Sequence, residues 1–456
     1  MVSANELFAG YLSDALGEDN AGIAIAALEE PASVSVRWNP SKLPADIHDR
    51  ISDLVRVPWS EYGMMLDSRP VFTLDPLFHA GCYYVQDSSA MYPGYLLRSV
   101  IGAVELPSAV RVLDLCAAPG GKTTDAAASL RSAFGDGFLL VSNEVVRSRA
   151  SVLASNVAVW GDPCVAVCSA DPAGFGNLKG FFDIVLADVP CSGEGMFRKD
   201  EEAVAQWSAD NVAYCAARQR RIIADVWPAL SEGGYLIYST CTFNRFENDD
   251  NVRWISENLG AEIIYPEKET LPPGVLATEY GCCLVPGLVK GEGQYCAVLK
   301  KTAPQPRMDR TGRPPRQEPS SGAVQDFFTV PVSVSDKNGL LKAVPSAIAA
   351  EMSYAEDKLK MISSGCAAFT RKGRDLVPHP DLALNIRFRK EACPAAETDR
   401  NTALKFLHRD SLALHDMEKG YVLICHDGMP LGFVKNLGNR CNSLMPQERR
   451  IRMDVE

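Results

Sequence analysis

The run from Phe182 to Lys199 constrains the fold more than any other stretch: Phe-Asp-Ile-Val-Leu-Ala-Asp-Val-Pro-Cys-Ser-Gly-Glu-Gly-Met-Phe-Arg-Lys. Its first half is apolar and β-branched, which predicts a buried strand, and its second half is a turn rich in Gly, Pro and Ser. An acid, Asp188, and a thiol, Cys191, therefore follow the carboxyl end of a strand. In open α/β sheets this is the edge at which ligands bind.

A second thiol occurs in an almost identical setting further along the chain. The segment Gly-Gly-Tyr-Leu-Ile-Tyr-Ser-Thr-Cys-Thr-Phe-Asn carries Cys241 directly after another apolar, strand-like run. Because both cysteines leave a strand for a polar loop, we predict a single site that contains two thiols.

Between residues 96 and 302, apolar strand-like runs alternate with stretches long enough for crossover helices, which is typical of a βαβ sheet. The predicted fold class is α/β with a doubly wound sheet. The expected strands are Val110–Leu115, Phe138–Ser142, Val165–Cys168, Asp183–Ala187, Tyr235–Ser239 and Tyr295–Leu299.

At about 150 residues per domain, a chain of 456 residues is expected to form about three units. The sequence outside residues 96–302 divides into an N-terminal extension, a linker and a C-terminal region. Residues 1–95 form a small α+β N-terminal extension, in which the residues alone favour core packing beside a helix N-cap for the aromatic cluster at 78–89. Residues 303–324 are rich in Pro and Arg and form a linker. Residues 325–456 form a C-terminal α+β region, in which an Asp-Gly turn inside 420–435 predicts a β-hairpin.

Charge and cysteine content limit the partners. The net charge is −11, but residues 1–302 carry −15 and residues 303–456 carry +4, so the C-terminal part permits a polyanion. The 14 cysteines have no zinc-site spacing, so we expect no metal site, and most of these thiols are expected to be small buried hydrophobes. We also expect no signal peptide, no membrane span and a cytoplasmic location.

The segment from Asp114 to Thr123, Asp-Leu-Cys-Ala-Ala-Pro-Gly-Gly-Lys-Thr, predicts a strand, a glycine turn and the start of a helix. Such a turn lets backbone approach a ligand closely. A phosphate-binding P-loop is excluded because Cys116 occupies the position of its first glycine, and the Gly-x-Gly-x-x-Gly dinucleotide fingerprint is absent. These exclusions leave a nucleoside ligand with little phosphate.

Acids follow the successive predicted strands. Glu144 is placed to bind ribose hydroxyls, and Asp171 and Asp188 follow the third and fourth strands. Each acid alone is more often a helix cap or turn former than a ligand-binding group. Together with Asp114 they favour a cationic ligand, and the sulfonium of S-adenosylmethionine is cationic.

The thiols indicate a reaction at a pyrimidine. Addition of a thiolate to C6 of cytosine makes C5 nucleophilic towards a methyl group, and a base must then remove the C5 proton. An acid beside N3 would stabilise the charge that develops on the ring. Asp188, Cys191 and Cys241 could supply these groups, although local sequence leaves open which thiol attacks.

These motifs, with Tyr-Ser-Thr-Cys-Thr-Phe-Asn-Arg-Phe-Glu-Asn around Cys241, closely resemble those of the NOP/Sun family of RNA 5-methylcytosine methyltransferases. The segments around Arg37 and at 79–89 resemble the family's N-terminal extension, which replaces the core-packing interpretation of that cluster. Residues 420–435 and 442–452 are similar to the C-terminal domain of the bacterial RsmF-type (YebU-type) branch. The resemblance implies a Rossmann-like S-adenosylmethionine-dependent sheet and a PUA-like RNA-binding C-terminal region.

The resemblance also implies roles for single residues. Cys241 would be the nucleophile, Cys191 would assist proton removal or release, and Asp188 would contact N3 of the base. RNA phosphate would be met by Arg37, Arg198 and Lys199. The cofactor S-adenosylmethionine would be held by Cys116, Ala117, Ala118, Pro119, Gly120, Gly121, Lys122, Glu144, Asp171 and Asp188.

The resulting prediction is an RNA cytosine-C5 methyltransferase that acts on an unpaired or flipped base. The resemblance of the tail implies 16S ribosomal RNA or the 30S subunit as the partner. A tRNA cytosine methyltransferase is the alternative, and a ribosome-assembly factor with little catalysis is an alternative from another class. DNA is not expected as a partner, because the paired cysteines belong to RNA enzymes. The segment 282–294 departs most from the family pattern.

Overall fold

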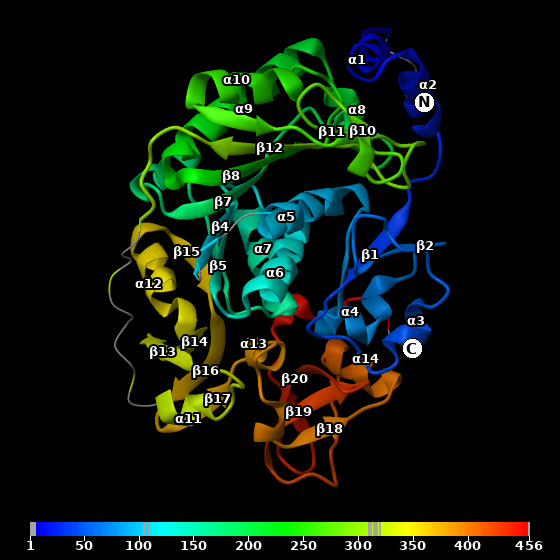
Figure 1. The fold of residues 1–456 in the computed structure, drawn as a ribbon. Helices are drawn as coiled ribbons and strands as arrows, with labels where there is room; N and C mark the ends of the chain where they lie inside the picture. Colours follow the sequence, from blue (N-terminus) through cyan, green and yellow to red (C-terminus); the bar gives the residue numbers. More distant parts are fainter. Residues whose placement is uncertain are drawn as a thin grey trace.

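The computed structural model describes residues 6–103, 106–107, 109–308, 312, 318 and 321–454. The expected arginines Arg310, Arg313 and Arg316 of the predicted linker lie outside the described residues. Figure 1 shows a central sheet with helices on both faces and smaller sheets below it.

The N-terminal part is a three-stranded antiparallel sheet of order β2-β1-β3, preceded by two helices. Its elements are α1 (Glu6–Leu16), α2 (Glu18–Ala27), β1 (Val34–Trp38), α3 (Ile47–Ile51), β2 (Gly63–Leu66), α4 (Pro76–Ala80) and β3 (Tyr83–Val85). The helix α4 begins where Asp75 accepts a hydrogen bond from Leu77 N and ends at Gly81, which adopts a left-handed conformation with φ of 75°.

The central sheet has the strand order β10-β11-β12-β8-β7-β4-β5-β6-β15, and β9 pairs with β12. Strands β6, β5, β4, β7 and β8 are parallel, whereas β12 and β15 run antiparallel at their positions. The strands are β4 (Val110–Asp114), β5 (Phe138–Asn143), β6 (Val165–Cys168), β7 (Phe182–Asp188), β8 (Leu230–Thr240), β9 (Ala261–Ile264), β10 (Leu276–Ala277), β11 (Cys282–Leu284) and β12 (Gln294–Lys301).

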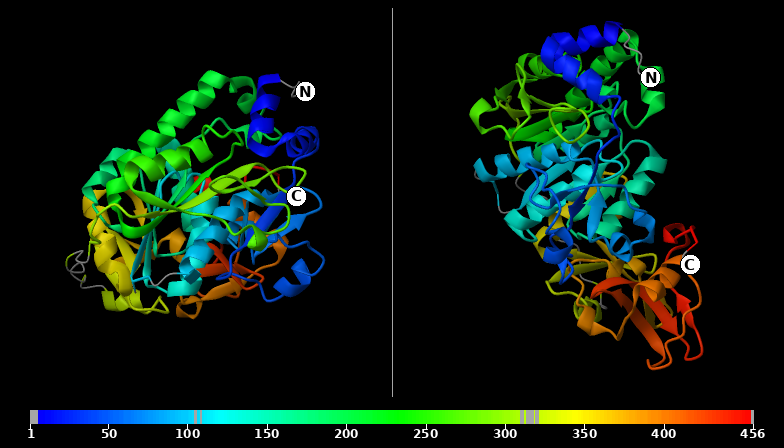
Figure 2. Two further views of the ribbon diagram at one scale, coloured as in Figure 1. Left: turned by 45° about the horizontal axis from the view of Figure 1, so that its top comes forward. Right: turned by 90° about the vertical axis from the view of Figure 1, so that its right-hand side faces the viewer.

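These strands confirm the predicted doubly wound sheet and each of the six expected strands, with end positions that differ by at most five residues. Every residue of β4 and β5 is buried, as expected for parallel strands with helices on both faces. Figures 1 and 2 show α5, α6 and α7 together on one face and α9 and α10 on the other. The helices are α5 (Tyr92–Ala103), α6 (Gly121–Phe134), α7 (Arg147–Trp160), α8 (Glu201–Gln206), α9 (Ala209–Val226) and α10 (Asp249–Leu259).

The chain leaves β4 in one direction through β5 and β6 and returns to the other side of β4 with β7. This reversal places a topological switch point between β4 and β7, and crevices at the carboxyl ends of such strands bind ligands. The glycine turn after β4 and the Cys191 turn after β7 therefore lie next to each other.

The C-terminal region contains two four-stranded sheets. The first sheet has the strand order β13-β14-β16-β17, with β13 (Val332–Lys337), β14 (Leu340–Pro345), β16 (Cys366–Lys372) and β17 (Asp375–Pro378). The helices in this part of the chain are α11 (Ser321–Gln325), α12 (Ala349–Lys358) and α13 (Pro380–Ala383). The strand β15 (Met361–Ser364) instead joins the edge of the central sheet beside β6. A domain boundary at residue 302 therefore assigns one strand of the central sheet, β15, to the C-terminal region.

The second sheet has the order β18-β19-β20-β21, built from β18 (Ala395–Glu397), α14 (Arg400–His408), β19 (Gly420–His426), β20 (Met429–Asn436) and β21 (Cys441–Ser443). Strands β19 and β20 confirm the predicted hairpin, and its turn residues Asp427 and Gly428 have positive φ of 49° and 70°. This sheet shares a core with the N-terminal part, in which Trp38 and Val36 pack with Phe406 and Ile424. Figure 2 shows α1 and α2 at one end of the molecule and this sheet at the other.

Candidate active site

A cavity of about 330 Å³ opens at the carboxyl ends of β4, β5, β7 and β8. It contains both thiols of the predicted site together with five of the ten residues predicted for the cofactor. Its lining includes Cys116, Ala118, Glu144, Asp171, Asp188, Cys191 and Cys241, with Arg149, Arg218 and Arg221. Residues from six separate sequence regions therefore meet at the switch point of the sheet.

The glycine turn after β4 supplies backbone to one side of this cavity. Gly120 has φ of 115°, a conformation that L side chains rarely adopt, and a Cβ there would lie 3.1 Å from the side chain of Leu153. The helix α6 starts at the next residue, so its first N–H groups point out of the turn. The turn is anchored by Thr123, whose hydroxyl donates to Asp114 over 2.6 Å, and burial raises the pKa of Asp114 to about 7.

Lys122, which follows this turn, extends to β7. Its ammonium donates to Asp188 Oδ2 over 2.9 Å, and the side chain of Ser239 donates to Asp188 Oδ1 over 2.8 Å. The Lys122 pKa is raised above its usual value, because the attraction of Asp188 outweighs the opposing effect of burial. Lys122 thus joins the glycine turn after β4 to the end of β7, from which the Cys191 turn begins.

The other two predicted acids act both as local caps and as walls of the cavity. Glu144 Oε1 accepts from Val146 N over 2.9 Å, and its Oε2 pairs with Arg149 over 3.3 Å. Asp171 accepts from Ala173 N over 3.0 Å at the start of a short 3₁₀ helix. Capping and ligand binding, which the sequence offered as competing interpretations, are compatible at these positions.

The two thiols lie side by side. Strands β7 and β8 pair in parallel with Asp188 opposite Ser239, so the turns that follow them carry Cys191 and Cys241 to the same place. Their Sγ atoms are 3.2 Å apart, and both cysteines are free. The hydrogen bond to Cys241, together with burial, raises the pKa of the Cys191 thiol well above its usual value.

Two buried carboxylates that the sequence analysis did not single out tie the two cysteine turns together. Glu194, from the Cys191 turn, accepts hydrogen bonds from Phe243 N, Asn244 N, Asn244 Nδ2 and Trp207 Nε1 over 2.8–3.0 Å. Glu247, from the Cys241 turn, accepts from Ser192 N over 3.0 Å in the reverse direction. The sequence does show an acid inside each cysteine motif, but an acidic side chain in a polar turn is normally expected to be exposed to solvent.

Glu247 gives this site a pH dependence. Burial raises its pKa from 4.5 to about 7, although Gln219 and Asn244 donate to it over 2.7 and 2.8 Å. Because the pKa of Glu247 is higher in the folded than in the unfolded protein, its protonated form stabilises the fold. This contribution is complete below pH 4.5 and is lost as the pH rises through about 7. We expect the free energy of unfolding of Glu247→Gln to lack this fall, which is at most about 3 kcal/mol in the native chain. Urea unfolding between these pH values measures it, and parallel pH profiles of the two proteins would contradict it.

The segment 282–294, where the sequence departs from the family pattern, completes the site. Gln294 Nε2 donates to Thr240 O over 2.9 Å, directly before Cys241, and approaches Asp188 Oδ1 at 3.4 Å. The backbones also touch, since a Cβ on Gly195 would lie 2.6 Å from Gly293 Cα. The two glycines therefore allow this segment to pack against the Cys191 turn.

Two of the three residues predicted to contact RNA, Arg37 and Arg198, are buried. Arg37 is 1% exposed and donates to Gln86 Oε1, Thr124 Oγ1 and Gly121 O over 2.6–3.2 Å, which fixes β1 to α6. Arg198 has a side chain that is 6% exposed, and it bonds Glu292 Oε2 at 2.8 Å and Gly291 O at 2.7 Å. Neither guanidinium is open to a phosphate, because each already has buried acceptors.

Lys199 is the predicted RNA contact that reaches the surface. Its side chain is 30% exposed, and its ammonium pairs with Asp87 Oδ2 at 3.1 Å and with Glu292 Oε1 at 3.2 Å. These pairs join the Cys191 turn to the end of the aromatic cluster of the N-terminal extension.

The position of Arg37 predicts a large stability effect. Its Nε lies 3.8 Å from Asp125 Oδ1, and its guanidinium lies 4.8 Å above the ring of Trp160. Arg37→Ala leaves these buried acceptors without their donor, so we expect a loss of about 3–5 kcal/mol in the free energy of unfolding, measured by urea denaturation. The matched control is the exposed Arg374, whose replacement by alanine is expected to cost less than about 0.5 kcal/mol. Similar midpoints for both variants would overturn this prediction.

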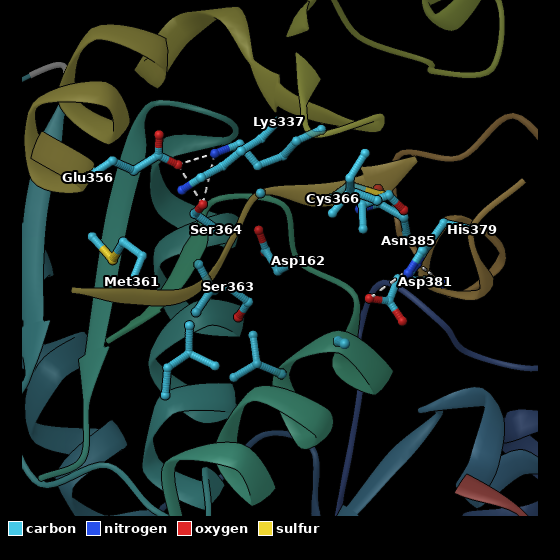
Figure 3. Close-up of a pocket in the computed structure, with 18 of the residues that line it drawn as sticks. Asp162, Lys337, Glu356, Met361, Ser363, Ser364, Cys366, His379, Asp381 and Asn385 are labelled. Carbon is cyan, nitrogen blue, oxygen red and sulfur yellow. Dashed lines mark hydrogen bonds and ion pairs between the residues drawn. The ribbon is translucent and has the colours of Figure 1, made fainter. Parts of the chain in front are cut away.

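A larger cavity, of about 530 Å³, lies between α7, β15 and the sheet of β14 and β16 (Figure 3). Lys342 pairs there with Glu356, which also accepts from Ser364 Oγ. Its one cysteine, Cys366, is 3% exposed, and burial raises the pKa of that thiol well above its usual value. This cavity lacks the paired thiols and the glycine turn, so the smaller cavity is the candidate active site.

Among the described residues, no group of three or more His, Cys, Asp or Glu side chains is arranged to hold a metal ion. Within the same residues, no helix combines the length and apolar character that a membrane crossing requires.

Comparison with known proteins shows similarity along most of the chain. Residues 103–300 match the family model for the 16S rRNA methyltransferase RsmB/F, residues 5–88 that for the N-terminal domain of 16S rRNA methyltransferase RsmF, and residues 393–451 that for the methyltransferase RsmF PUA domain. The chain is 30% identical to ribosomal RNA small subunit methyltransferase F of Shewanella baltica (strain OS223), over 93% of this chain and 92% of the relative.

Two solved structures from Pyrococcus horikoshii share the fold. A methyltransferase homolog protein is 26% identical with a TM-score of 0.55, over 66% of this chain and 96% of that one. NSun6, whose structure was solved with SFG, is 18% identical with a TM-score of 0.53, over 65% of this chain and 97% of that one. Both alignments extend over about two thirds of the present chain.

Proposed function

Because this chain belongs to the family of ribosomal RNA small subunit methyltransferase F, we propose that it methylates C5 of a cytosine in 16S ribosomal RNA through a covalent bond between Cys241 and C6. The family establishes an S-adenosylmethionine-dependent RNA methyltransferase with a C-terminal PUA domain. The observation that carries the cytosine-C5 chemistry is the 3.2 Å separation of the Cys191 and Cys241 sulfurs inside the candidate active site.

The cavity suits the cofactor. The turn from Cys116 to Lys122 offers backbone N–H groups at the start of α6, and Glu144 and Asp171 are placed for hydroxyl and amino groups of a nucleoside. Three carboxylates around the cavity, including Asp188, are compatible with a sulfonium. When bound there, S-adenosylmethionine supplies the electrophilic methyl group.

The local environment supports Cys241 as the attacking thiol. The contact with Cys241, together with burial, raises the pKa of the Cys191 thiol, and a thiol with a raised pKa is a weaker nucleophile at neutral pH. Attack on C6 would leave an electron-rich C5 that accepts the methyl group. Once Cys241 is bonded to carbon, the main cause of the raised Cys191 pKa is removed, so Cys191 could then serve in removal of the C5 proton.

Asp188 is proposed to contact N3 of the target base. Lys122 Nζ, which donates to Asp188 Oδ2 over 2.9 Å, holds this carboxyl group in position beside the two thiols. The hydroxyl of Ser239 keeps the opposite carboxylate oxygen in place. Both contacts support a role for the pair in stabilising charge on the ring.

We propose the domain division 1–95, 96–302, 303–324 and 325–456, with RNA contacts from the first and last parts and from Lys199. The PUA match at 393–451 supports an RNA-binding role for the end of the chain. Since β15 joins the central sheet, residues 361–364 would move with the catalytic part. An enzyme with this substrate would act in the cytoplasm, where 16S RNA and the 30S subunit are found.

Bisulfite sequencing of total RNA from cells with and without the gene tests this function. We expect one or more protected cytosines in 16S RNA to become convertible when the gene is deleted. Loss of protection in tRNA alone would keep the chemistry and replace the substrate. Unchanged protection throughout would contradict the proposal and favour an assembly factor that binds RNA without methylating it.

A further inference from the structure

The outer face of α9 carries three large side chains, Tyr214, Arg218 and Arg221, whose function the preceding sections leave unassigned. The buried face of this helix consists of Val212, Cys215, Ala216, Gln219, Ile222, Ile223 and Val226. Tyr214, Arg218 and Arg221 follow one another at i, i+4 and i+7, so they form a single stripe on the other side of the helix. Figure 1 shows α9 beside β8, the strand that leads to Cys241.

The two arginines reach the catalytic cavity. Arg218 and Arg221 line it together with Cys191 and Cys241, and the charge of Arg218 acts on the thiol of Cys116 at its inner wall. Within the part of the chain that the structure describes, neither guanidinium has a hydrogen bond or an ion pair. Other arginines near the site, Arg37, Arg149 and Arg198, are each paired with an acid.

Tyr214 continues this stripe away from the cavity. It is 65% exposed, the most exposed of the large apolar and aromatic side chains in the described chain, and none of the described rings stacks on it. With a rise of about 1.5 Å per residue, Tyr214 lies about 10 Å along the helix from Arg221. An exposed aromatic ring beside unpaired cations is the combination that proteins use for single-stranded nucleic acid.

We propose that Tyr214, Arg218 and Arg221 form a track for the RNA strand next to the target cytosine. Arg218 and Arg221 bind phosphates at the mouth of the cavity, and Tyr214 stacks on a neighbouring base. This inference rests on the proposed RNA substrate. The track holds the backbone of a nucleotide that has left the stack, and it carries no sequence preference, since phosphates and ring faces are common to all nucleotides.

Direct binding of an unstructured, mixed-sequence RNA oligonucleotide by the full chain tests the track, and methyl transfer is not needed for it. Fluorescence anisotropy between about 50 and 200 mM salt gives the dependence of affinity on salt. Each phosphate contact on a single strand contributes about 0.7 to the magnitude of the slope of log affinity against log salt concentration. The double variant Arg218→Ala/Arg221→Ala, which removes two such contacts, should therefore lower that magnitude by about 1.4. Tyr214→Ala should weaken binding about fivefold or more, whereas Tyr214→Phe should retain it.

Matched controls separate the track from general surface charge. Arg374→Ala, in the turn between β16 and β17, and Tyr265→Ala, whose ring is 61% exposed, should leave the slope and affinity unchanged. Calorimetric titration with S-adenosylmethionine should give the same affinity for native and double-variant protein. Unchanged RNA binding by the double variant, or a loss confined to cofactor affinity, would overturn the proposal, the latter by assigning the arginines to the cofactor carboxylate.

These results separate failure of the track from failure of the proposed function. Loss of RNA affinity in the double variant with unaltered bisulfite patterns in deletion cells would keep the track and reject the reaction. The reverse combination would keep the reaction and reject the track.

Discussion

Replacing Cys241 by alanine is expected to reduce methyl transfer to 16S RNA by at least about 10⁴-fold. In the proposed mechanism the Cys241 thiol forms the covalent bond that activates C5, so its removal leaves that step without its nucleophile. Transfer of a radiolabelled methyl group from S-adenosylmethionine to 16S RNA isolated from deletion cells measures the loss. The variant should also give no protein–RNA complex that survives denaturant.

The control for this experiment is Cys393→Ala. Cys393 is a free thiol in the C-terminal part, remote in sequence from both motifs, and its partner is the carbonyl of Lys390 at 3.7 Å. Its replacement is expected to leave the rate within about twofold of the native value, in line with small effects of changes away from the site. Cofactor affinity measured on both variants shows that the cavity is intact. Measurable turnover by Cys241→Ala would assign the nucleophile elsewhere.

Local sequence predicted the sheet and the edge at which the site lies. Buried parallel strands are continuous apolar runs, so β4, β5 and β7 can be recognised without tertiary information. The position of a residue directly after such a strand then determines its place at the sheet edge. Asp188 and Cys191 were found in this way, since their location depends only on the strand before them.

The network between the two cysteine turns could not be predicted in the same way. Glu194 and Glu247 are buried at 1% and 0% exposure, but their donors belong to the other turn, about fifty residues away in the chain. An acid in a Gly-rich turn is normally solvated, and only the pairing of β7 with β8 removes it from water. Burial of these acids is therefore a tertiary property.

The arginines also show that sequence alone does not reveal which charged side chains are buried and paired. Arg37 and Arg198 are cations in polar segments, which is the composition of a phosphate contact, yet each is satisfied by acceptors far along the chain. Arg218 and Arg221 lie on a helix whose sequence gives no sign of a nearby cavity. Which cations are free depends on partners that the fold brings together.

The C-terminal division was also beyond the sequence analysis. Residues 361–364 form a short strand of ordinary composition, and they pair with β6 because that edge of the central sheet is otherwise open. The shared core between the N-terminal sheet and β19–β20 likewise links parts that are more than 300 residues apart. Such long-range pairings leave no periodic signal in either segment.

Replacing Cys191 by alanine is expected to trap the enzyme on its product. If Cys191 assists removal of the C5 proton, the variant should still form the bond between Cys241 and C6 and transfer the methyl group, but elimination should fail. The 3.2 Å contact between the sulfurs places Cys191 next to the atom that must leave. Turnover is expected to fall by about 10²–10⁴-fold, the usual contribution of a general acid or base.

Electrophoresis in denaturant with labelled 16S RNA measures the trapped complex. We expect a shifted band for Cys191→Ala that requires S-adenosylmethionine, and none for the double variant Cys191→Ala/Cys241→Ala, because the second change removes the bond itself. Cys393→Ala should behave like the native chain. A single variant that shows neither a band nor slower turnover would reduce Cys191 to a packing residue. A band that persists in the double variant would mean that the bond to RNA comes from another side chain, since both sulfurs would then be absent.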